Sequence, residues 1–417
     1  MDDAEEIPEQ VHPEKPCVDA GTQGHSTTQA VAVTKVLDDD NLLREIIVRV
    51  ALPNTLVRAA LVCKRWLEHA SDRKFLSRFH QLHPPRLLGY YKYDKWNSFE
   101  ELYPTHFVPM LPQPPELATI IRRLESYNFG ARKIVLCQDG SIFTSCREGE
   151  NWILEVHRPL CPKRHTQIIP PLPHVHEWNW IFSQIISKEE GSNMSYLYVS
   201  GEATEETREL TTNVYMLQDG EWRLRTSATC PHGLHEHPIA VRLLHNKIYM
   251  PSAITDDIFV LDLMTSNFSA IQPPQGVKYS YRKSMLSQAD DASSVYLFDV
   301  KWFQLHVWLH KGDNWLLVDS FCLHDMLDTL GMPSHILENE GIPIVHIRHV
   351  GDNGELVFLQ IGQCIFYLDI KCRKLCKVYE YTKNGRYAAS IHPLMMVWPP
   401  TFPGIKEDIS RKLLDGQ

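Results

Sequence analysis

The strongest constraint on the fold is a repeat of short apolar runs in the second half of the chain. The segments "NVYMLQDGEWRL" and "HVWLHKGDNWLL" share an apolar run, a turn signal and a tryptophan, at Trp222 and Trp315. Between them, "DIFVLDLMTSNFSAI" places Phe268 at the equivalent position, and "CIFYLDIKCRKLCKV" later places Leu375 there. The steps between these positions are 46, 47 and 60 residues. The chain therefore repeats a unit of several short strands.

A period near 45 residues with several strands per unit is typical of β-propeller blades. Because one blade cannot bury both of its faces alone, we expect the copies to stack around an axis, as six or seven blades. "GENWILEV" around Trp152 is interpreted as an earlier copy, and "CLHDMLDTLGMPSHILENEG" as an inserted loop with a short helix. The copies are degenerate, so a β-sandwich or an open all-β array is the alternative fold.

Composition and charge argue against a nucleic-acid-binding, membrane-spanning or secreted protein. The net charge of -9 argues against a nucleic-acid partner, which would favour a basic surface. No window of eighteen apolar residues occurs, so we expect no membrane span. The acidic first thirty residues lack the apolar run of a signal peptide, and the 10 cysteines are scattered, as is typical of reduced thiols. We therefore expect a soluble protein of the cytoplasm and/or nucleus.

One segment has residues suited to metal binding. "CPHGLHEHP" brings Cys230, His232, His235 and His237 close together in the sequence. Zinc sites usually add a second ligand pair at a defined spacing, and this segment has the Pro and Gly of a loop. No set of nucleophile, base and orienting residue can be nominated elsewhere. We therefore expect no catalytic residue, no metal and no cofactor.

The region from 36 to 83 has a different, helical pattern. Leu42, Leu43, Ile46, Ile47 and Val50 recur at the spacing of a helix face. The run of aspartates at 38–40 offers N-capping oxygens, and the proline at 53 ends this helix before another begins. The apolar residues cover more than one side of these short helices. Such a surplus is typical of a segment that binds a partner.

The stretch "VLDDDNLLREIIVRVALPNTLVRAALVCKRW" resembles an F-box, the helical module that docks onto Skp-family adaptors. The shared features are the leading Leu37, "LLREI", "LP" and "LVCKRW". The family usually has proline after the first leucine, where this chain has Asp38, so we expect a slightly less rigid start of the first helix. The β-rich half is similar to the kelch-like or F-box-associated halves of plant-type members.

The resemblance implies residues that face or support the adaptor, although each of them can instead fill the core of its own domain. These are Leu37, Leu42, Leu43, Ile46, Pro53, Leu56, Val57, Cys63 and Trp66.

The expected fold class is α+β and multidomain, a small N-terminal helical F-box followed by an all-β domain. The expected parts are a disordered acidic leader (1–35), the F-box (36–83), a linker with the first strands (84–130), a β-propeller-like substrate-binding domain (131–400) and a tail (401–417).

The resemblance implies a non-catalytic substrate receptor of a Skp–cullin–F-box (SCF) ubiquitin ligase. The chain would bind the adaptor and, through it, the cullin and the RING protein. The β domain would bind an unidentified target protein for proteasomal degradation, with loops at 162–178, 228–238 and 322–342 as candidate contacts. An enzyme or sugar-binding propeller with an accessory helical segment is the alternative, as is an F-box protein that acts outside a ligase.

Overall fold

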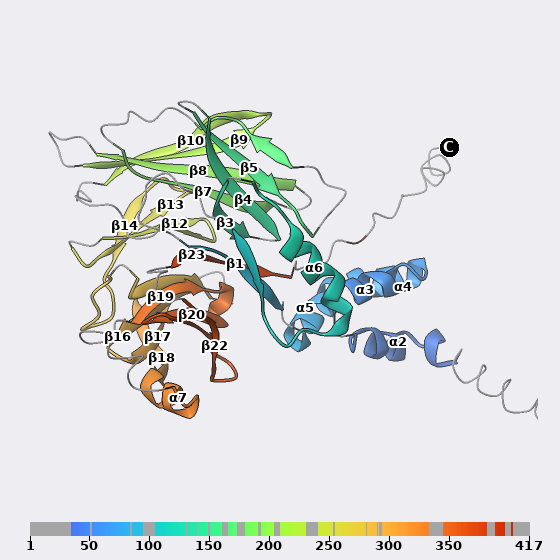
Figure 1. The fold of residues 1–417 in the computed structure, drawn as a ribbon. Helices are drawn as coiled ribbons and strands as arrows, with labels where there is room; N and C mark the ends of the chain where they lie inside the picture. Colours follow the sequence, from blue (N-terminus) through green and yellow to red (C-terminus); the bar gives the residue numbers. More distant parts are fainter. Residues whose placement is uncertain are drawn as a thin grey trace, which may run out of the picture. The chain divides into compact units, whose positions relative to one another are not determined.

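The computed structural model of the chain describes residues 35–50, 52–83, 86–94, 105–130, 132–138, 140–148, 151–160, 166–172, 180–190, 193–203, 209–230, 241–252, 255–280, 282–289, 291, 294–332, 345–381, 388–396 and 402. The chain divides into two units, a helical unit at the N-terminal side and a unit that spans Arg86–Met396. Figure 1 shows the helices and strands of both. None of the helices within the described residues is long and apolar enough to cross a membrane.

The helical unit consists of α2 (Asp40–Ile47), α3 (Pro53–Ala60), α4 (Lys64–Ser71) and α5 (Arg73–Leu82). Local capping sets where these helices begin. The side chain of Asp39 accepts hydrogen bonds from the backbone N–H groups of Asn41 and Leu42, at 2.8 and 3.0 Å. Helix α3 begins with its proline, which lacks the N–H that the first turn leaves unpaired. The side chain of Asp72 caps α5 by accepting a hydrogen bond from the backbone N–H of Phe75, at 3.0 Å.

One face of each helix in this unit supplies a common apolar core. Its buried members are Leu43, Ile47, Val48, Leu56, Ala60, Ala70, Phe75 and Phe79. The side chain of Phe402, far along the chain, also packs against this core. A carboxylate–guanidinium pair between Glu45 and Arg78 joins α2 to α5.

The second unit is a β-propeller of six blades, which confirms the predicted architecture and fixes the blade number. Five blades are four-stranded antiparallel sheets whose strands follow one another in the sequence. The first blade consists of β3 (Lys133–Gln138), β4 (Ser141–Glu148), β5 (Asn151–His157) and β6 (Gln167–Ile169), and the second of β7 (Trp180–Glu190), β8 (Asn193–Ala203), β9 (Leu210–Gln218) and β10 (Glu221–Cys230). The third blade consists of β11 (Arg242–Leu244), β12 (Lys247–Pro251), β13 (Ile258–Asp262) and β14 (Phe268–Ile271), and the fourth of β15 (Ser284–Gln288), β16 (Val295–Lys301), β17 (Gln304–Lys311) and β18 (Asn314–Cys322). The fifth blade consists of β19 (Val345–Val350), β20 (Leu356–Ile361), β21 (Cys364–Asp369) and β22 (Lys374–Glu380).

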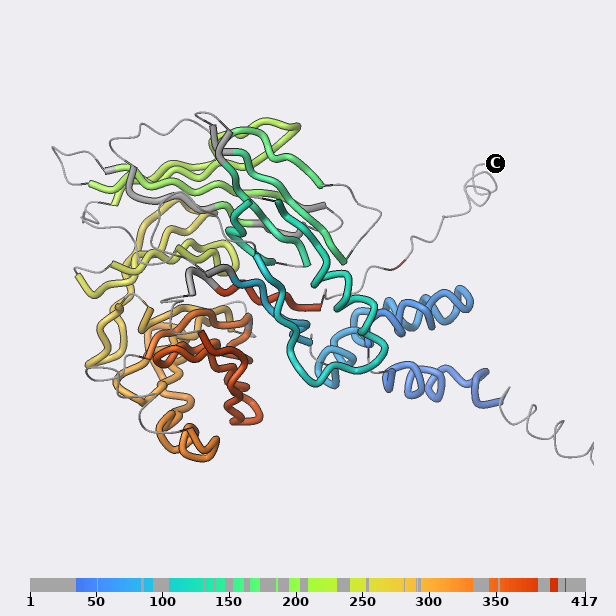
Figure 2. The backbone as a smooth tube through the Cα atoms, viewed as in Figure 1, coloured from blue at the N-terminus to red at the C-terminus, as the bar shows by residue number. Residues whose placement is uncertain are grey.

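The sixth blade joins the two ends of this unit. Strand β1 (Leu87–Asp94) pairs on one side with β2 (His106–Pro109) and on the other with β23 (Ala388–Met395). Figure 2 shows the late strand β23 running beside the early strand β1. The first strands of successive blades also lie next to each other, β11 beside β15 and β15 beside β19, and β23 continues this row between β19 and β3. A short helix, α6 (Ala118–Ser126), follows β2 after a 3₁₀ turn at Pro115–Leu117.

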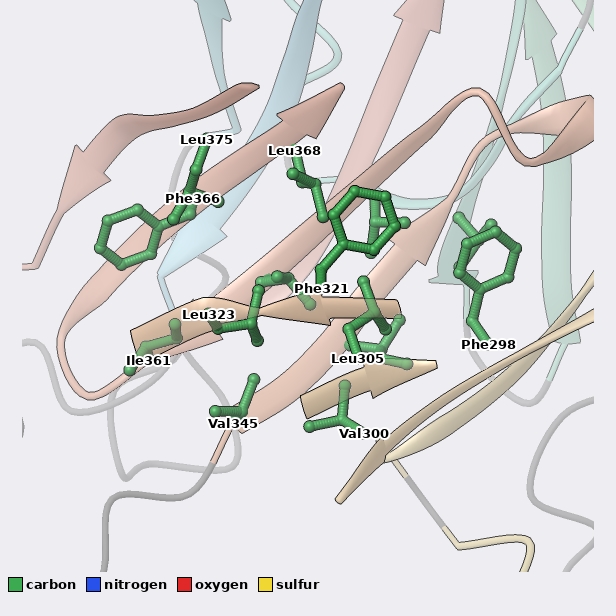
Figure 3. Packing of buried hydrophobic residues seen from close by; sticks show 14 of the residues in the cluster. Phe298, Val300, Leu305, Phe321, Leu323, Val345, Ile361, Phe366, Leu368 and Leu375 are labelled. Carbon is green, nitrogen blue, oxygen red and sulfur yellow. The ribbon is translucent and has the colours of Figure 1, made fainter. Parts of the chain in front are cut away.

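Each apolar cluster of the propeller is shared between neighbouring blades. The largest one lies between the fourth and fifth blades, where Phe298, Leu305 and Phe321 meet Val345, Phe366 and Leu368 (Figure 3). Separate clusters join the first blade to the second, the second to the third, the third to the fourth and the fifth to the sixth. Burying a large apolar side chain contributes roughly 1.5–3 kcal/mol, so stacking stabilises every blade through its neighbours.

The predicted repeat corresponds to the fourth strand of a blade. Trp222, Phe268, Trp315 and Leu375 each lie at the start of a fourth strand, opposite Leu217, Leu261, His310 and Leu368 of the third strand. A β-bulge follows at the same offset on three of these strands, at the residue three places after the tryptophan or leucine. The shared register confirms that these segments are copies of one structural unit.

Two details of the predicted repeat can be compared with the structure. Trp152, interpreted as part of an earlier copy, lies on β5, the third strand of its blade, and so does not occupy the fourth-strand position of the other copies. The insertion before the last copy does contain a short helix, α7 (Leu323–Thr329). Two residues of α7, Leu323 and Leu327, are buried in the cluster between the fourth and fifth blades.

The two repeat tryptophans bind the preceding blade in the same way. Trp222 Nε1 donates to the carbonyl oxygen of Pro170, at 3.1 Å, directly after β6. Trp315 Nε1 donates to the carbonyl oxygen of Gln272, at 2.7 Å, directly after β14. A tryptophan at this position therefore connects its own outer strand to the end of the outer strand one blade earlier.

Candidate functional site

Helix α2 has apolar residues on two faces that differ in burial. Leu43 and Ile47 are fully buried in the core of the helical unit, whereas Leu42 and Ile46 are 46% and 43% exposed. Residues four apart lie one above the other on a helix, so each pair forms a stripe. The outward stripe of Leu42 and Ile46 is not needed for the packing of this unit.

A second group of exposed apolar residues lies between α3 and α4. Leu61 and Val62 are 62% and 63% exposed, and the neighbouring Cys63 is exposed as well. Leu61 and Val62 were not among the residues predicted to bind a partner. Their signal in the sequence is the pair of apolar residues directly after the small residues that end α3.

The structure divides the predicted adaptor-binding residues into three groups. Leu42, Ile46 and Cys63 are exposed, while Leu37, Val57 and Trp66 are partly buried. Leu43, Pro53 and Leu56 are buried in the core of their own unit. The buried group can shape a docking surface only by supporting it, and the exposed group can contact a partner directly.

Arg65 of α4 holds the segment that precedes α2. Its Nη1 donates to the Leu37 carbonyl oxygen at 2.7 Å, and its Nη2 donates to the Asp38 carbonyl oxygen at 2.6 Å. Its Nε donates to Oδ1 of Asp40 at 2.8 Å. We call these three bonds the Arg65 clamp. The clamp fixes the chain at the position where related sequences have a proline.

His69 extends the clamp within α4. Arg44 Nε donates to His69 Nδ1 at 3.1 Å, so the imidazole proton is on Nε2, which donates to Asp40 Oδ1 at 2.9 Å. Hydrogen bonds from His69 and, to a smaller extent, from Arg65 hold the pKa of the Asp40 carboxyl below its usual value. The carboxylate therefore stays ionised as the common acceptor of the two side chains.

Three histidines of the segment "CPHGLHEHP" lie outside the described residues, namely His232, His235 and His237. Within the described part of the chain, no group of three or more His, Cys, Asp or Glu side chains is placed to hold a metal ion. Of the predicted target-contact loops, most of 162–178 and 228–238 lies outside the described residues, whereas 322–342 is described as far as residue 332 and includes α7.

Comparison with known proteins gives one family match. The family described as "F-box protein AT5G49610-like, beta-propeller" matches residues 133–402. The helical unit precedes the matched range. No curated protein matches the sequence.

Solved structures show only distant likenesses. A functionally unknown protein from Desulfotomaculum acetoxidans is 10% identical, with 70% of this chain and 82% of that chain covered and a TM-score of 0.37. The GH93 α-L-arabinofuranosidase of Fusarium graminearum is 12% identical, with 61% and 82% covered and a TM-score of 0.35. Similarities at TM-scores this low give no information about function.

Proposed function

The chain belongs to the F-box protein AT5G49610-like beta-propeller family, and from this premise we propose that it is a substrate receptor of an SCF ubiquitin ligase. The helical unit is the F-box that binds a Skp-family adaptor and, through it, the cullin and the RING protein. The propeller holds a target protein, and the protein acts in the cytoplasm or the nucleus. Its contribution to catalysis is proximity, because it raises the effective concentration of target lysines near the ubiquitin-charged enzyme.

The exposed stripe of Leu42 and Ile46 is the observation that supports this proposal best. A short helical unit has little apolar surface to spare, and an amphipathic helix commonly docks its apolar side into a groove of a partner. The stripe stands beside the buried Leu43 and Ile47, so the unit can fold and still present apolar side chains. The Arg65 clamp supports the same function, because it fixes the start of the helix that carries the stripe.

Co-purification with a Skp-family adaptor tests the proposal. We expect Leu42→Asp with Ile46→Asp to abolish co-purification. About half of each side chain is still available for burial, which is worth roughly 1 kcal/mol per residue. Losing both contacts weakens binding by about thirtyfold, before the cost of burying two carboxylates is added.

A matched control is Lys74→Asp with Ser77→Asp, which places two aspartates on exposed positions of α5. This control should keep the adaptor bound, and both variants should keep the helical circular dichroism of the native chain. If the α2 variant is folded and co-purifies with the adaptor as well as the native chain does, the stripe is not the docking surface.

A further inference from the structure

Basic side chains from four blades converge on the inner edge of the propeller. Lys133 lies on β3, Arg242 on β11, His349 on β19 and His392 on β23. Strands β3, β11 and β19 are the first strands of their blades and β23 is an edge strand of the sixth blade; β19 lies beside β23, which in turn lies beside β3. Arg242 reaches across the intervening β15, where its Nη2 contacts Sδ of Met285 at 3.4 Å. We call these four residues the inner basic cluster.

The charged groups that act on the two histidines are other members of the inner basic cluster. Burial, together with the charges of Arg242 and His392, lowers the pKa of His349 to about 3. Burial also lowers the pKa of His392 to about 4, with an added effect of the Lys133 charge. Every charged group that shifts these two pKa values is itself basic. At neutral pH the histidines are therefore uncharged N–H donors between two cationic side chains.

More basic side chains lie on and beside β19. Burial, together with the charges of Arg348 and of Arg282 and Lys283 directly before β15, lowers the pKa of His346 to about 4. The backbone N–H of Ile347 donates to the Arg282 carbonyl oxygen at 2.5 Å, which holds the two segments together. Arg348 Nε donates to Oε1 of Gln360 at 2.8 Å, and this neutral amide orients the guanidinium without cancelling its charge. The basic character thus continues along the strand.

This concentration of positive charge contrasts with the chain as a whole. The net charge is -9, so acidic groups prevail over the rest of the sequence. The cluster is accessible to a ligand, because Lys133 is exposed and Arg242, His349 and His392 are only half-buried. Basic residues gathered from several strands at one accessible place form a positive potential that attracts anions and strengthens their hydrogen bonds.

We propose that the inner basic cluster binds an anionic group, phosphate or carboxylate, carried by a segment of the target protein. This inference rests on the proposed function, in which the propeller holds a protein target. Recognition of phosphorylated or acidic motifs by clustered basic side chains is a recurring mode of peptide binding. A nucleic acid is the less suitable anion, because it would also meet the acidic remainder of the molecule.

The test measures peptide binding to the purified full-length chain by fluorescence anisotropy. The probes are a short fluorescent Glu-rich peptide, the same peptide with phosphoserine in place of the glutamates, and a Gln-substituted peptide of the same length. We expect the first two to bind and the Gln peptide not to bind. Inorganic phosphate should displace the bound peptides, and tighter binding of either anionic peptide identifies phosphate or carboxylate as the preferred group.

Single substitutions locate the site. Arg242→Gln should weaken binding about tenfold, the loss of one charge-assisted hydrogen bond. Lys133→Gln, at an exposed position, should weaken it about threefold because water screens its charge. Arg242→Lys keeps the charge and should bind within about threefold of the native chain. The matched control is Lys311→Gln, an exposed lysine in the hairpin between β17 and β18, which should change nothing.

Three outcomes would overturn the proposal: equal binding of the Gln peptide, native-like binding by folded Arg242→Gln and Lys133→Gln, or tighter binding of single-stranded RNA than of either anionic peptide. A thermal unfolding curve for each variant excludes loss of the fold as the cause of weak binding. The stripe on α2 plays no part in this assay. If the native chain binds the anionic peptides but does not bind the adaptor, only the proposed function is contradicted.

Discussion

Two tryptophans in one blade allow a comparison in which the same substitution has different effects. Trp315 and Trp308 lie on neighbouring strands, β18 and β17, and both pack against the cluster shared by the third and fourth blades. Trp315 Nε1 donates to the Gln272 carbonyl oxygen, whereas Trp308 Nε1 is buried and has no hydrogen-bond partner among the described residues. Replacing each by phenylalanine removes the same ring volume and the same N–H donor.

The magnitudes follow from what each donor contributes. Trp315→Phe loses one hydrogen bond between blades, worth about 1 kcal/mol net. Trp308→Phe removes a buried, unpaired donor, whose burial costs about 1–3 kcal/mol, so this substitution offsets its own loss of packing. We therefore expect Trp308→Phe to be more stable than Trp315→Phe by about 2 kcal/mol or more. For a domain of this size that corresponds to a difference of about 4 °C in Tm.

Urea unfolding of the full-length chain, followed by far-ultraviolet circular dichroism, measures the two free energies without relying on tryptophan fluorescence. Trp222→Phe is the independent check, because Trp222 makes the equivalent bond to Pro170 and should lose a similar amount to Trp315→Phe. If Trp308→Phe proves less stable than Trp315→Phe at equal m-values, the assignment of donors is wrong. Equal stability of all three variants would mean that the bonds between blades contribute little.

Two further predictions concern charges. Arg65→Gln should weaken adaptor binding several-fold while α2 stays helical, because only the clamp on the preceding segment is lost; unchanged affinity in a titration would show that the clamp does not position the stripe. Acidification should destabilise the propeller, since burial lowers the pKa of His349 and His392 and the unfolded chain takes up protons first. This stability is complete above about pH 6.5 and is lost as the pH falls towards 4. His349→Gln should flatten the dependence of Tm on pH.

The propeller could be predicted from the sequence because its repeat is carried by packing. Trp222 and Trp315 recur since each outer strand must cover the end of the preceding blade, and that requirement returns once per blade. The order of strands within a blade is less evident from the sequence. Third and fourth strands both follow turns and both carry apolar residues, and for this reason the third-strand segment around Trp152 was interpreted as an earlier copy of segments that lie on fourth strands.

The exposed apolar surface that we propose for docking was only partly predictable from the sequence. Helical periodicity places Leu42 and Leu43 on adjoining faces, but which of them is buried depends on where α4 and α5 pack against α2. The sequence identified both residues and could not separate them. Leu61 and Val62 lie between two helices, where periodicity carries no information, and they were missed. The clamp was missed as well, because the backbone oxygens that Arg65 binds are 27 and 28 residues away in the sequence and only the fold brings them to it.

The inner basic cluster could not be predicted from the sequence, because its residues are brought together only when the propeller closes. Lys133, Arg242 and His392 lie more than a hundred residues from one another in the sequence, and each alone looks like an ordinary polar residue of a strand. They meet because β23 returns to pair with β1, which brings the end of the propeller beside β3. Strand β23 therefore has two roles that depend on each other, since it closes the ring and supplies His392 to the cluster. A change that opens the sixth blade must also disperse the cluster, so anion binding should be lost together with closure of the propeller and not after it.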